Sequence, residues 1–457
     1  MKKKHVDMLS GSVMRGLFTM AVPVMIMNVA ASLFNLADSA ALKAFGHGTA
    51  VGAVSAAGTL QTVFTCLVTG LAAGASVVIA RHLGAKERRR AEEAASTALL
   101  LAVGLGLFLL VVGCFSARTL LVLMNCKGTL LEEATTYMRI YFLGAPFLAL
   151  LSFSSAALRS IGDTRRPMYI LFIGCILKLV LTVTFLSISD KGVESVALAT
   201  LVTFLVKAIL TLGALVRSRE AITVDLRHMT FRMSELRATL YNGLPPAAQT
   251  ALYSLANVVI ISAVNLFGPD ATTGVGIANQ YDGIIYQLVC APSVAAIPHV
   301  AQNIGAGDSR RAKRAIICAM MITIGFGASL GSFSAIFAPQ LSGLLATTTA
   351  ARDYAVQKMI IISSTYFICG INEVVGGALK GMGRPISPMI ANLIYLCGLR
   401  FIWVYAVFPL VPNLTFLYLV WPISWACSIV TLLPFLSHAL RSLGRKRAAA
   451  AEGAASK

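Results

Sequence analysis

Twelve long apolar segments dominate the sequence, and they limit the possible folds more than any other feature. An α-helix needs about 20 mainly apolar residues to cross the ~30 Å hydrocarbon core of a bilayer. Strands of a membrane β-barrel would instead alternate apolar and polar residues over about ten positions. The sequence therefore predicts an all-α membrane protein with twelve transmembrane helices. The apolar runs lie near residues 16–42, 50–80, 94–116, 136–157, 168–188, 193–216, 240–267, 274–303, 315–338, 357–379, 387–410 and 414–438.

The distribution of charge supports the same fold class. Only 12% of the 457 residues are charged, which is about half the share found in a soluble chain. The net charge of +19 resides in short basic clusters between the apolar runs. That pattern follows the positive-inside rule, so no nucleic-acid partner is expected. Most of the 38 Lys and Arg residues fall in alternate loops if the N-terminus lies inside. We therefore expect both termini to be cytoplasmic.

An internal repeat divides the chain into two related halves. Residues Gly84–Ala91 match Gly305–Ala312, and Leu158–Met168 match Leu379–Met389, with the same offset of 221 residues. Two separate motifs that share one offset indicate a duplication. Each half holds six predicted spans, and because six is even, both halves enter the membrane from the same side. A pseudo-twofold axis along the membrane normal is therefore expected to relate two six-helix lobes.

The repeat and the predicted spans define four regions. They are an N-lobe at 1–216, a cytoplasmic linker at 217–239, a C-lobe at 240–440 and a basic cytoplasmic tail at 441–457. Apolar residues recur at helical spacing in the linker, which favours an amphipathic helix on the inner membrane surface. A flexible basic loop is the alternative.

Further motifs follow one another in a recognisable order. They are Pro23 with Asn35 and Asp38, Ala80–Glu87, Leu158–Met168, Gln249–Gly268, Gln302–Asp308, and Glu373 through Leu379–Pro385 to Arg400. Their order resembles that of the multidrug and toxic compound extrusion (MATE) family, particularly its bacterial members, over nearly the whole chain. The resemblance implies a secondary efflux transporter. Such a protein exchanges H⁺ or Na⁺ for small amphipathic, often cationic, organic compounds by alternating access to a V-shaped cavity between two lobes.

Several expectations about partners follow. The sequence has no Walker loop, metal-ligand cluster or nucleophile triad, so we expect no enzyme activity, no metal and no cofactor beyond the coupling ion. The expected partners are a small-molecule substrate and membrane lipid. The expected form is a monomer in the bacterial plasma (inner) membrane. The alternative function is a flippase for a lipid-linked precursor, which should carry an excess of Lys and Arg in its cavity to bind pyrophosphate.

Six charged residues stand out within the predicted spans. A charge in hydrocarbon costs at least ~2.5–3.5 kcal/mol, so each needs a partner or a wet cavity. The three acids are candidate ion-coupling residues, because an acid that holds either a proton or a cationic substrate couples the two fluxes. The balance of three acids and three bases argues mildly against the flippase. The six residues are Asp38, Lys178, Lys207, Asp282, Glu373 and Arg400.

The first lobe departs from its family at one position. Asp38 shares a helical face with Asn28 and Asn35, and the matching acid in the family is a cation-binding or protonation site. Lys178 and Thr182 stand where the family usually has an Asn and an Asp that complete this site. The hypothesis is that Lys178 pairs with Asp38 and removes the Na⁺ site. Pairing of Lys178 elsewhere, and an interfacial role for Asp38, are the alternatives.

Polar residues also recur at helical spacing in the second lobe. They are predicted to line the substrate cavity together with Asn28, Asn35, Lys178 and Arg400, and ordinary helix packing is the alternative for each. A structural ion pair with Glu373 is the other role considered for Arg400. The second-lobe residues are Gln249, Tyr253 and Asn257 at i, i+4 and i+8, and Asn279 and Tyr286 on the face of Asp282.

Overall fold

A computed structural model describes residues 6–45, 48–124, 126–189, 192–218, 222–225, 227–346 and 348–455. Within these ranges the chain forms helices and no strand, which confirms the predicted all-α class. Ten of the described helices are long and apolar enough to cross a membrane. Two bent helix pairs bring the number to twelve if each pair is one span.

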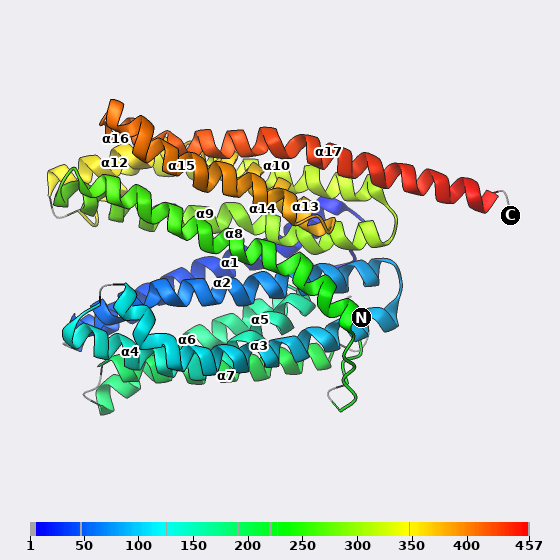
Figure 1. The fold of residues 1–457 in the computed structure, drawn as a ribbon, viewed down its shortest axis with the longest axis horizontal. Coiled ribbons are helices and arrows are strands. Elements are labelled where there is room, and N and C mark those ends of the chain that lie inside the picture. The colour runs from blue at the N-terminus through cyan, green and yellow to red at the C-terminus, as the bar shows by residue number, and fades with distance from the viewer. Residues whose placement is uncertain are drawn as a thin grey trace. The chain divides into compact units, whose positions relative to one another are not determined.

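The two halves of the chain contain comparable series of helices (Figure 1). The first half contains α1 (Val13–Ala44), α2 (Gly48–Gly84), α3 (Arg88–Leu123), α4 (Gly128–Leu143), α5 (Ala145–Ser160), α6 (Arg165–Ile188) and α7 (Gly192–Val216). The second half begins with α8 (Met233–Asn265), α9 (Pro269–Gly305), α10 (Ser309–Ile336), α11 (Ala338–Gly343), α12 (Thr349–Ser363) and α13 (Tyr366–Gly381). It ends with α14 (Ile386–Asn392), α15 (Leu399–Ile402), α16 (Leu414–Tyr418) and α17 (Val420–Ala455). The predicted tail from residue 441 is thus helical in its described part.

The span at 386–410 alternates between two kinds of helix. Two π-helical segments, Leu393–Gly398 and Trp403–Val407, flank the four-residue helix α15, and a 3₁₀ turn at Phe408–Leu410 ends the span. A π turn inserts an extra residue into the helical ladder and often marks a functional site. Arg400 lies in α15, between the two π-helical segments.

Two spans are broken, one in each half. Helices α4 and α5 meet at 50°, and α12 and α13 meet at 47°. Pro146 follows the first break and has no N–H for the helical ladder. At the second break the Thr365 hydroxyl lies 2.9 Å from the Ile362 carbonyl and competes with the backbone. Gly144 and Thr365 are separated by the 221 residues of the sequence repeat.

Contacts divide the chain into two compact units. The first unit contains Ile26–Ala247. The second unit contains Val6–Met25 together with Ala248–Lys457. In the first unit, α2, α3 and α5 pack against one another, and α6 packs on α7. In the second unit, α9 lies at the centre, with α10, α12 and α13 packed against it (Figure 1). Each unit therefore has its own helical core.

The beginning of the chain belongs to the second unit. Met8 and Leu17 are buried in a cluster with residues of α9, α10, α13 and α17. The Arg311 guanidinium of α10 donates hydrogen bonds to the carbonyls of Met8, Ser10 and Gly11 at 3.0, 2.5 and 2.9 Å. This grouping differs from the predicted N-lobe at 1–216, because these contacts join residues about 300 positions apart in the chain.

The predicted linker contains an extended segment where the amphipathic helix was considered. Residues 222–225 and 227–232 form no helix, and α8 begins at Met233, inside the predicted range 217–239. Ile222 and Val224 are buried among apolar residues of α2, α3 and α7. Between them, the Thr223 N–H donates to the Glu92 carboxylate of α3 at 2.9 Å. Alternating burial, rather than a helical face, thus accounts for Ile222 and Val224.

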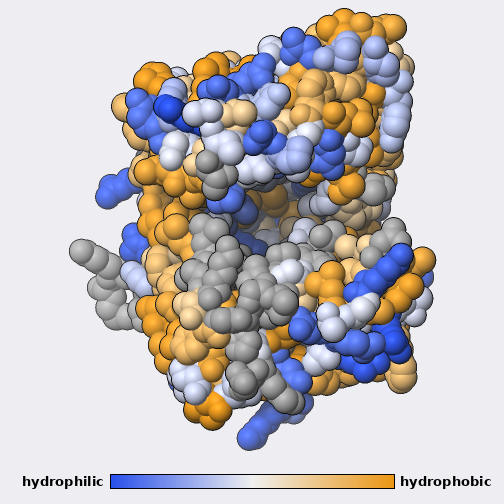
Figure 2. All heavy atoms as spheres, turned by 90° about the vertical axis from the view of Figure 1, so that its left-hand side faces the viewer, coloured by the Kyte–Doolittle hydropathy of each residue, from blue (hydrophilic) through white to orange (hydrophobic). Residues whose placement is uncertain are grey.

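Apolar side chains also cover much of the outside of the helices. Phe115, Ile188 and Leu266 are among the large apolar residues that remain exposed. On the face that Figure 2 shows, apolar side chains cover much of the area that is not grey, and hydrophilic side chains gather in patches among them. Extensive apolar surface on long helices is typical of a protein that faces lipid.

Candidate functional site

Two adjoining pockets lie within the second unit. The larger one, of about 260 Å³, is the Asp282 pocket, whose polar lining includes Asn257, Asn279, Asp282 and Lys358. The smaller one, of about 80 Å³, is the Glu373 pocket, whose polar lining includes Gln249, Glu373, Lys380 and Asn392. Both pockets share Tyr253, Tyr286 and Trp425. Helices α8, α9, α12, α13 and α17 and the irregular span at 386–410 supply these side chains.

A buried ion pair dominates the Asp282 pocket. The Lys358 ammonium of α12 lies 3.0 Å from the Asp282 carboxylate of α9, and the two side chains are 2% and 9% exposed. Lys358 also donates to the Asn279 side-chain carbonyl, one turn earlier on α9. The ammonium lies 5.7 Å from the centre of the Trp421 ring, a cation–π distance. The carboxylate of Asp282 is thus neutralised by a cation of the chain itself.

Arg400 is the second buried cation of this unit. Its side chain is 0% exposed, and its guanidinium donates to the Asn257 side-chain carbonyl at 2.8 Å. The guanidinium lies 4.8 Å from the Tyr253 ring and 5.5 Å from the Trp421 ring. Its Nε and Nη2 atoms have no hydrogen-bond partner among the described residues. Arg400 therefore contacts three residues of the Asp282 pocket but has no carboxylate partner within the described ranges.

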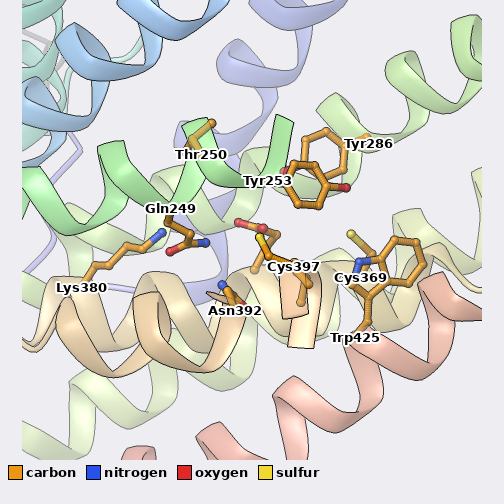
Figure 3. Close-up of a pocket in the computed structure, with 11 residues that line it drawn as sticks. Gln249, Thr250, Tyr253, Tyr286, Cys369, Lys380, Asn392, Cys397 and Trp425 are labelled. Atoms are coloured by element: carbon orange, nitrogen blue, oxygen red, sulfur yellow. The ribbon is translucent and has the colours of Figure 1, made fainter. Parts of the chain in front are cut away.

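The Glu373 pocket combines one acid with one base. Figure 3 shows the Lys380 and Gln249 side chains pointing toward one another, with Tyr253 and Tyr286 adjacent at the other end of the pocket. Glu373 is half-buried, and its backbone carbonyl accepts a hydrogen bond from Ser293 at 2.7 Å. Within the described part of the chain its carboxylate forms no ion pair, and Arg400 binds Asn257 rather than Glu373.

The structure thus brings together most of the second-lobe residues chosen from the sequence. Arg400 contacts this group, although it does not line either pocket itself. Their functional roles stay a prediction. The chosen residues that line the pockets are Gln249, Tyr253, Asn257, Asn279, Asp282, Tyr286 and Glu373.

The first-lobe candidates lie in the other unit. The side chains of Asn35 and Asp38 lie outside the described residues, so the pairing of Asp38 with Lys178 stays a prediction. Asn28 and Lys178 are half-buried on α1 and α6. The stem of Lys207 fills the space that Gly174 leaves open, and its ammonium lies 5.2 Å from the Phe204 ring.

Lys358 is the main residue that the sequence analysis missed. The predicted span began at residue 357, which placed this lysine at the membrane edge. The helix instead begins at Thr349, after Thr348 caps it by accepting a hydrogen bond from the Ala351 N–H at 3.1 Å. A threonine before a run of helix formers is a known N-terminal signal, and it could have placed Lys358 in the third turn.

No metal site is evident in the described ranges, where no group of three His, Cys, Asp or Glu side chains could hold a metal ion. The pockets offer aromatic rings, amides, two acids and the two cations Lys358 and Lys380, and Arg400 lies beside them as a third cation. Groups of these kinds are the ones with which ligand pockets in general hold and orient a charged organic molecule.

Comparison with known proteins gives consistent matches. The MatE family model matches the chain twice, at residues 23–184 and 245–406. An FAD transporter from Shewanella oneidensis is 28% identical over 400 residues, covering 86% of this chain and 87% of that protein. The probable multidrug resistance protein YoeA from Bacillus subtilis is 24% identical, covering 85% and 86%.

Solved structures of transporters are similar in fold. An outward-facing multidrug resistance MATE family transporter of the MOP superfamily has a TM-score of 0.89 at 21% identity, covering 97% of this chain and 100% of that chain. A MOP superfamily transporter from Pyrococcus furiosus has the same TM-score and identity, covering 97% and 99%. These likenesses confirm the predicted fold.

Proposed function

The chain belongs to the MatE family of multidrug and toxic compound extrusion (MATE) transporters, and from this premise we propose that it exports small amphipathic organic compounds in exchange for H⁺ or Na⁺. Transport would proceed by alternating access of the two lobes. The observation that supports this proposal is the pair of pockets in the second unit. They combine the buried carboxylate of Asp282 and the half-buried one of Glu373 with aromatic walls, the groups that an ion and an amphipathic molecule need.

Glu373 is the acid that we propose as the coupling residue of the second unit. Asp282 already holds the Lys358 ammonium at 3.0 Å, so an ion would have to displace a tethered cation from it. Glu373 lines the neighbouring pocket and forms no ion pair within the described part of the chain. A carboxylate that binds either the ion or the cargo couples the binding of one to the release of the other without covalent chemistry. Asp38 stays the corresponding candidate in the first lobe.

Transport in proteoliposomes tests this proposal. The purified protein is reconstituted, and dye movement is followed under an imposed H⁺ gradient and, separately, an imposed Na⁺ gradient. We expect one gradient to drive accumulation. The Glu373→Gln variant should lose at least about tenfold of the gradient-driven rate, the equivalent of ~1.4 kcal/mol, because its amide does not titrate, while dye binding in detergent persists.

A matched variant controls for non-specific loss. Asp353→Asn removes an exposed acid from α12 in the same unit and should transport as the unmodified protein does. Transport that is unaffected by either gradient, or a Glu373→Gln variant that keeps full coupling, would contradict the proposed mechanism.

Flipping of a lipid-linked precursor is the second candidate, and one observation favours it. With Lys358 included, the two pockets and Arg400 provide three cations against the two acids Asp282 and Glu373. This excess concerns the second unit alone, whereas the three-against-three balance counted both lobes, and an excess of cations suits pyrophosphate. The same reconstituted protein should then translocate a polyprenyl pyrophosphate, whereas an exporter of soluble compounds should not.

The names of the relatives suggest more than one kind of cargo. The protein from Bacillus subtilis is named a probable multidrug resistance protein, whereas that from Shewanella oneidensis is named an FAD transporter. FAD is an aromatic molecule with two phosphate groups. An anionic cargo is therefore considered beside the cationic compounds that the family resemblance suggested.

A further inference from the structure

The aromatic walls of the Asp282 pocket already face cations that belong to the protein. Trp421 has the Lys358 ammonium at 5.7 Å and the Arg400 guanidinium at 5.5 Å from its ring centre, and Tyr253 has Arg400 at 4.8 Å. Aromatic faces are the groups by which an apolar pocket usually attracts an organic cation. Here the rings already contact Lys358 and Arg400, two cations of the protein itself. The positive charge of these residues weakens the attraction of the rings for a cationic ligand.

The acid of this pocket, Asp282, is also paired with a cation of the protein. Lys358 lies 3.0 Å from the Asp282 carboxylate and donates to the Asn279 side chain as well. A cationic cargo would have to displace an ammonium that is 2% exposed and fixed to α12. An ammonium has three N–H donors, so two acceptors leave Lys358 one donor for a ligand.

Arg400 leaves the pocket with an excess of positive charge. It is 0% exposed, its Nη1 atom donates to the neutral Asn257, and its Nε and Nη2 atoms have no hydrogen-bond partner among the residues that the structure describes. A buried cation without an opposite charge is unfavourable in a membrane-embedded unit. An anion in the adjoining Asp282 pocket would compensate it through the low-dielectric interior.

We propose that the Asp282 pocket binds the anionic group of an amphipathic aromatic cargo, such as a carboxylate, sulfonate or phosphate, with Lys358 as its direct donor and Arg400 as a supporting charge. This substrate class rests on the export function proposed above. A volume of about 260 Å³ is just below the usual range of roughly 300–1,000 Å³ for drug-sized ligands. The pocket therefore holds the charged group with a neighbouring ring, and the rest of a larger cargo extends beyond it.

Two dyes with one ring system and opposite charge provide the test. Fluorescein is an anion and rhodamine 123 a cation, and both carry the xanthene scaffold. Binding of each to the purified full-length protein is measured by fluorescence anisotropy. The anion should bind at least about tenfold more tightly, as expected for one added charge-assisted hydrogen bond. Equal affinities, tighter binding of the cation, or binding of neither dye would overturn the proposal.

A charge-neutral double variant separates ligand binding from structure. Lys358→Gln combined with Asp282→Asn removes both members of the buried pair and leaves no unpaired charge between them. If Lys358 binds the cargo, the preference for fluorescein should fall about tenfold while the folded protein and rhodamine 123 binding are retained. If Lys358 merely neutralises Asp282, the double variant should keep the preference, and the proposal fails.

An exposed ion pair serves as the matched control. Arg118 and Glu132 lie 2.9 Å apart on α3 and α4 of the other unit, with exposures of 59% and 65%. Arg118→Gln combined with Glu132→Gln also removes one pair of charges without changing the net charge. We expect both dye affinities to stay as in the unmodified protein. A loss of anion preference in this control would mean that Lys358 and Asp282 do not define the site.

Further measurements identify the source of the anion and distinguish a failure of the anion-site proposal from a failure of the export proposal. Displacement of fluorescein by a polyprenyl pyrophosphate, but not by soluble aromatic carboxylates, would assign the pocket to a lipid-linked anion, and the reverse to a soluble one. Gradient-driven movement of rhodamine 123 without binding of fluorescein would overturn the anion site and leave export standing. Binding of fluorescein without gradient-driven movement of any dye would overturn export alone.

Discussion

Individual cations determine the chemistry of the second unit. Lys358 and Arg400 are both buried and both lie against Trp421, and of the two, among the described residues, only Lys358 has a carboxylate beside it. The sequence placed Arg400 in mid-membrane but offered Glu373 as its partner. The structure gives it Asn257, which is 143 residues away in the chain. Which acceptor a buried guanidinium finds depends on helix rotation, and a helix that is apolar on all sides carries no periodic signal for that rotation.

Asn257 allows a prediction about Arg400. Asn257→Ala should destabilise the protein by about 1–3 kcal/mol, because a buried charged donor loses its acceptor. The Asn257→Asp variant should instead have a melting temperature at or above that of the unmodified protein, because the aspartate supplies a counter-charge. The same variant should bind fluorescein more weakly. Thermal melting in detergent measures both, with Gln280→Ala on exposed α9 surface as the control. An Ala variant with unchanged melting would show that Arg400 does not depend on Asn257.

Helix packing at the element scale depends on small residues. Gly106 of α3 faces the backbone of Pro146 at the start of α5, so an added Cβ would overlap with it. Gly104, two residues earlier on the same helix, has no atom within 4 Å of the corresponding position. Small residues let membrane helices approach closely. Both glycines look alike in the sequence, and only the packing of α3 on α5 separates them.

Substitution of these two glycines should therefore have opposite effects. Gly106→Ala should cost about 1–3 kcal/mol of stability through overpacking. Gly104→Ala should be neutral or stabilise by up to ~1 kcal/mol, because alanine favours the helix. The melting temperature and the monodisperse fraction after size-exclusion chromatography measure the difference. A similar shift in the two variants would mean that α3 does not pack on α5 as described.

The whole molecule combines an expected duplication with an orientation that is still a prediction. The family model matches twice, and both halves carry a bent helix pair, at 50° and 47°. The positive-inside rule places both termini in the cytoplasm. The same rule places Lys86, before α3, inside and Lys127, after α3, outside, and both side chains are exposed.

Cysteine labelling tests this orientation. Lys86→Cys and Lys127→Cys are made separately in a chain whose nine cysteines have been replaced. A membrane-impermeant maleimide added to intact cells should label position 127 and should label position 86 only after permeabilisation. Labelling in the reverse pattern would place both termini outside and would reverse the direction assigned to transport.

The fold and the family could be predicted because their signals can be read directly from the order of residues along the chain. The length of an apolar run is set by the thickness of the bilayer, and a duplication leaves motifs at a constant offset. The depth of Lys358 in the membrane could not be predicted in this way. A charged and polar stretch at 348–358 hid the start of α12, so the predicted span began eight residues too late.

The sequence by itself determined that this chain is a duplicated helical membrane protein of the MATE type, with a small set of buried charges. Only the tertiary structure decided how those charges pair. Lys358 meets Asp282 across two helices, and Arg400 meets Asn257 instead of Glu373. The physical reason is that bilayer thickness acts on each segment separately, whereas an ion pair depends on the depth, bend and rotation of two segments at once.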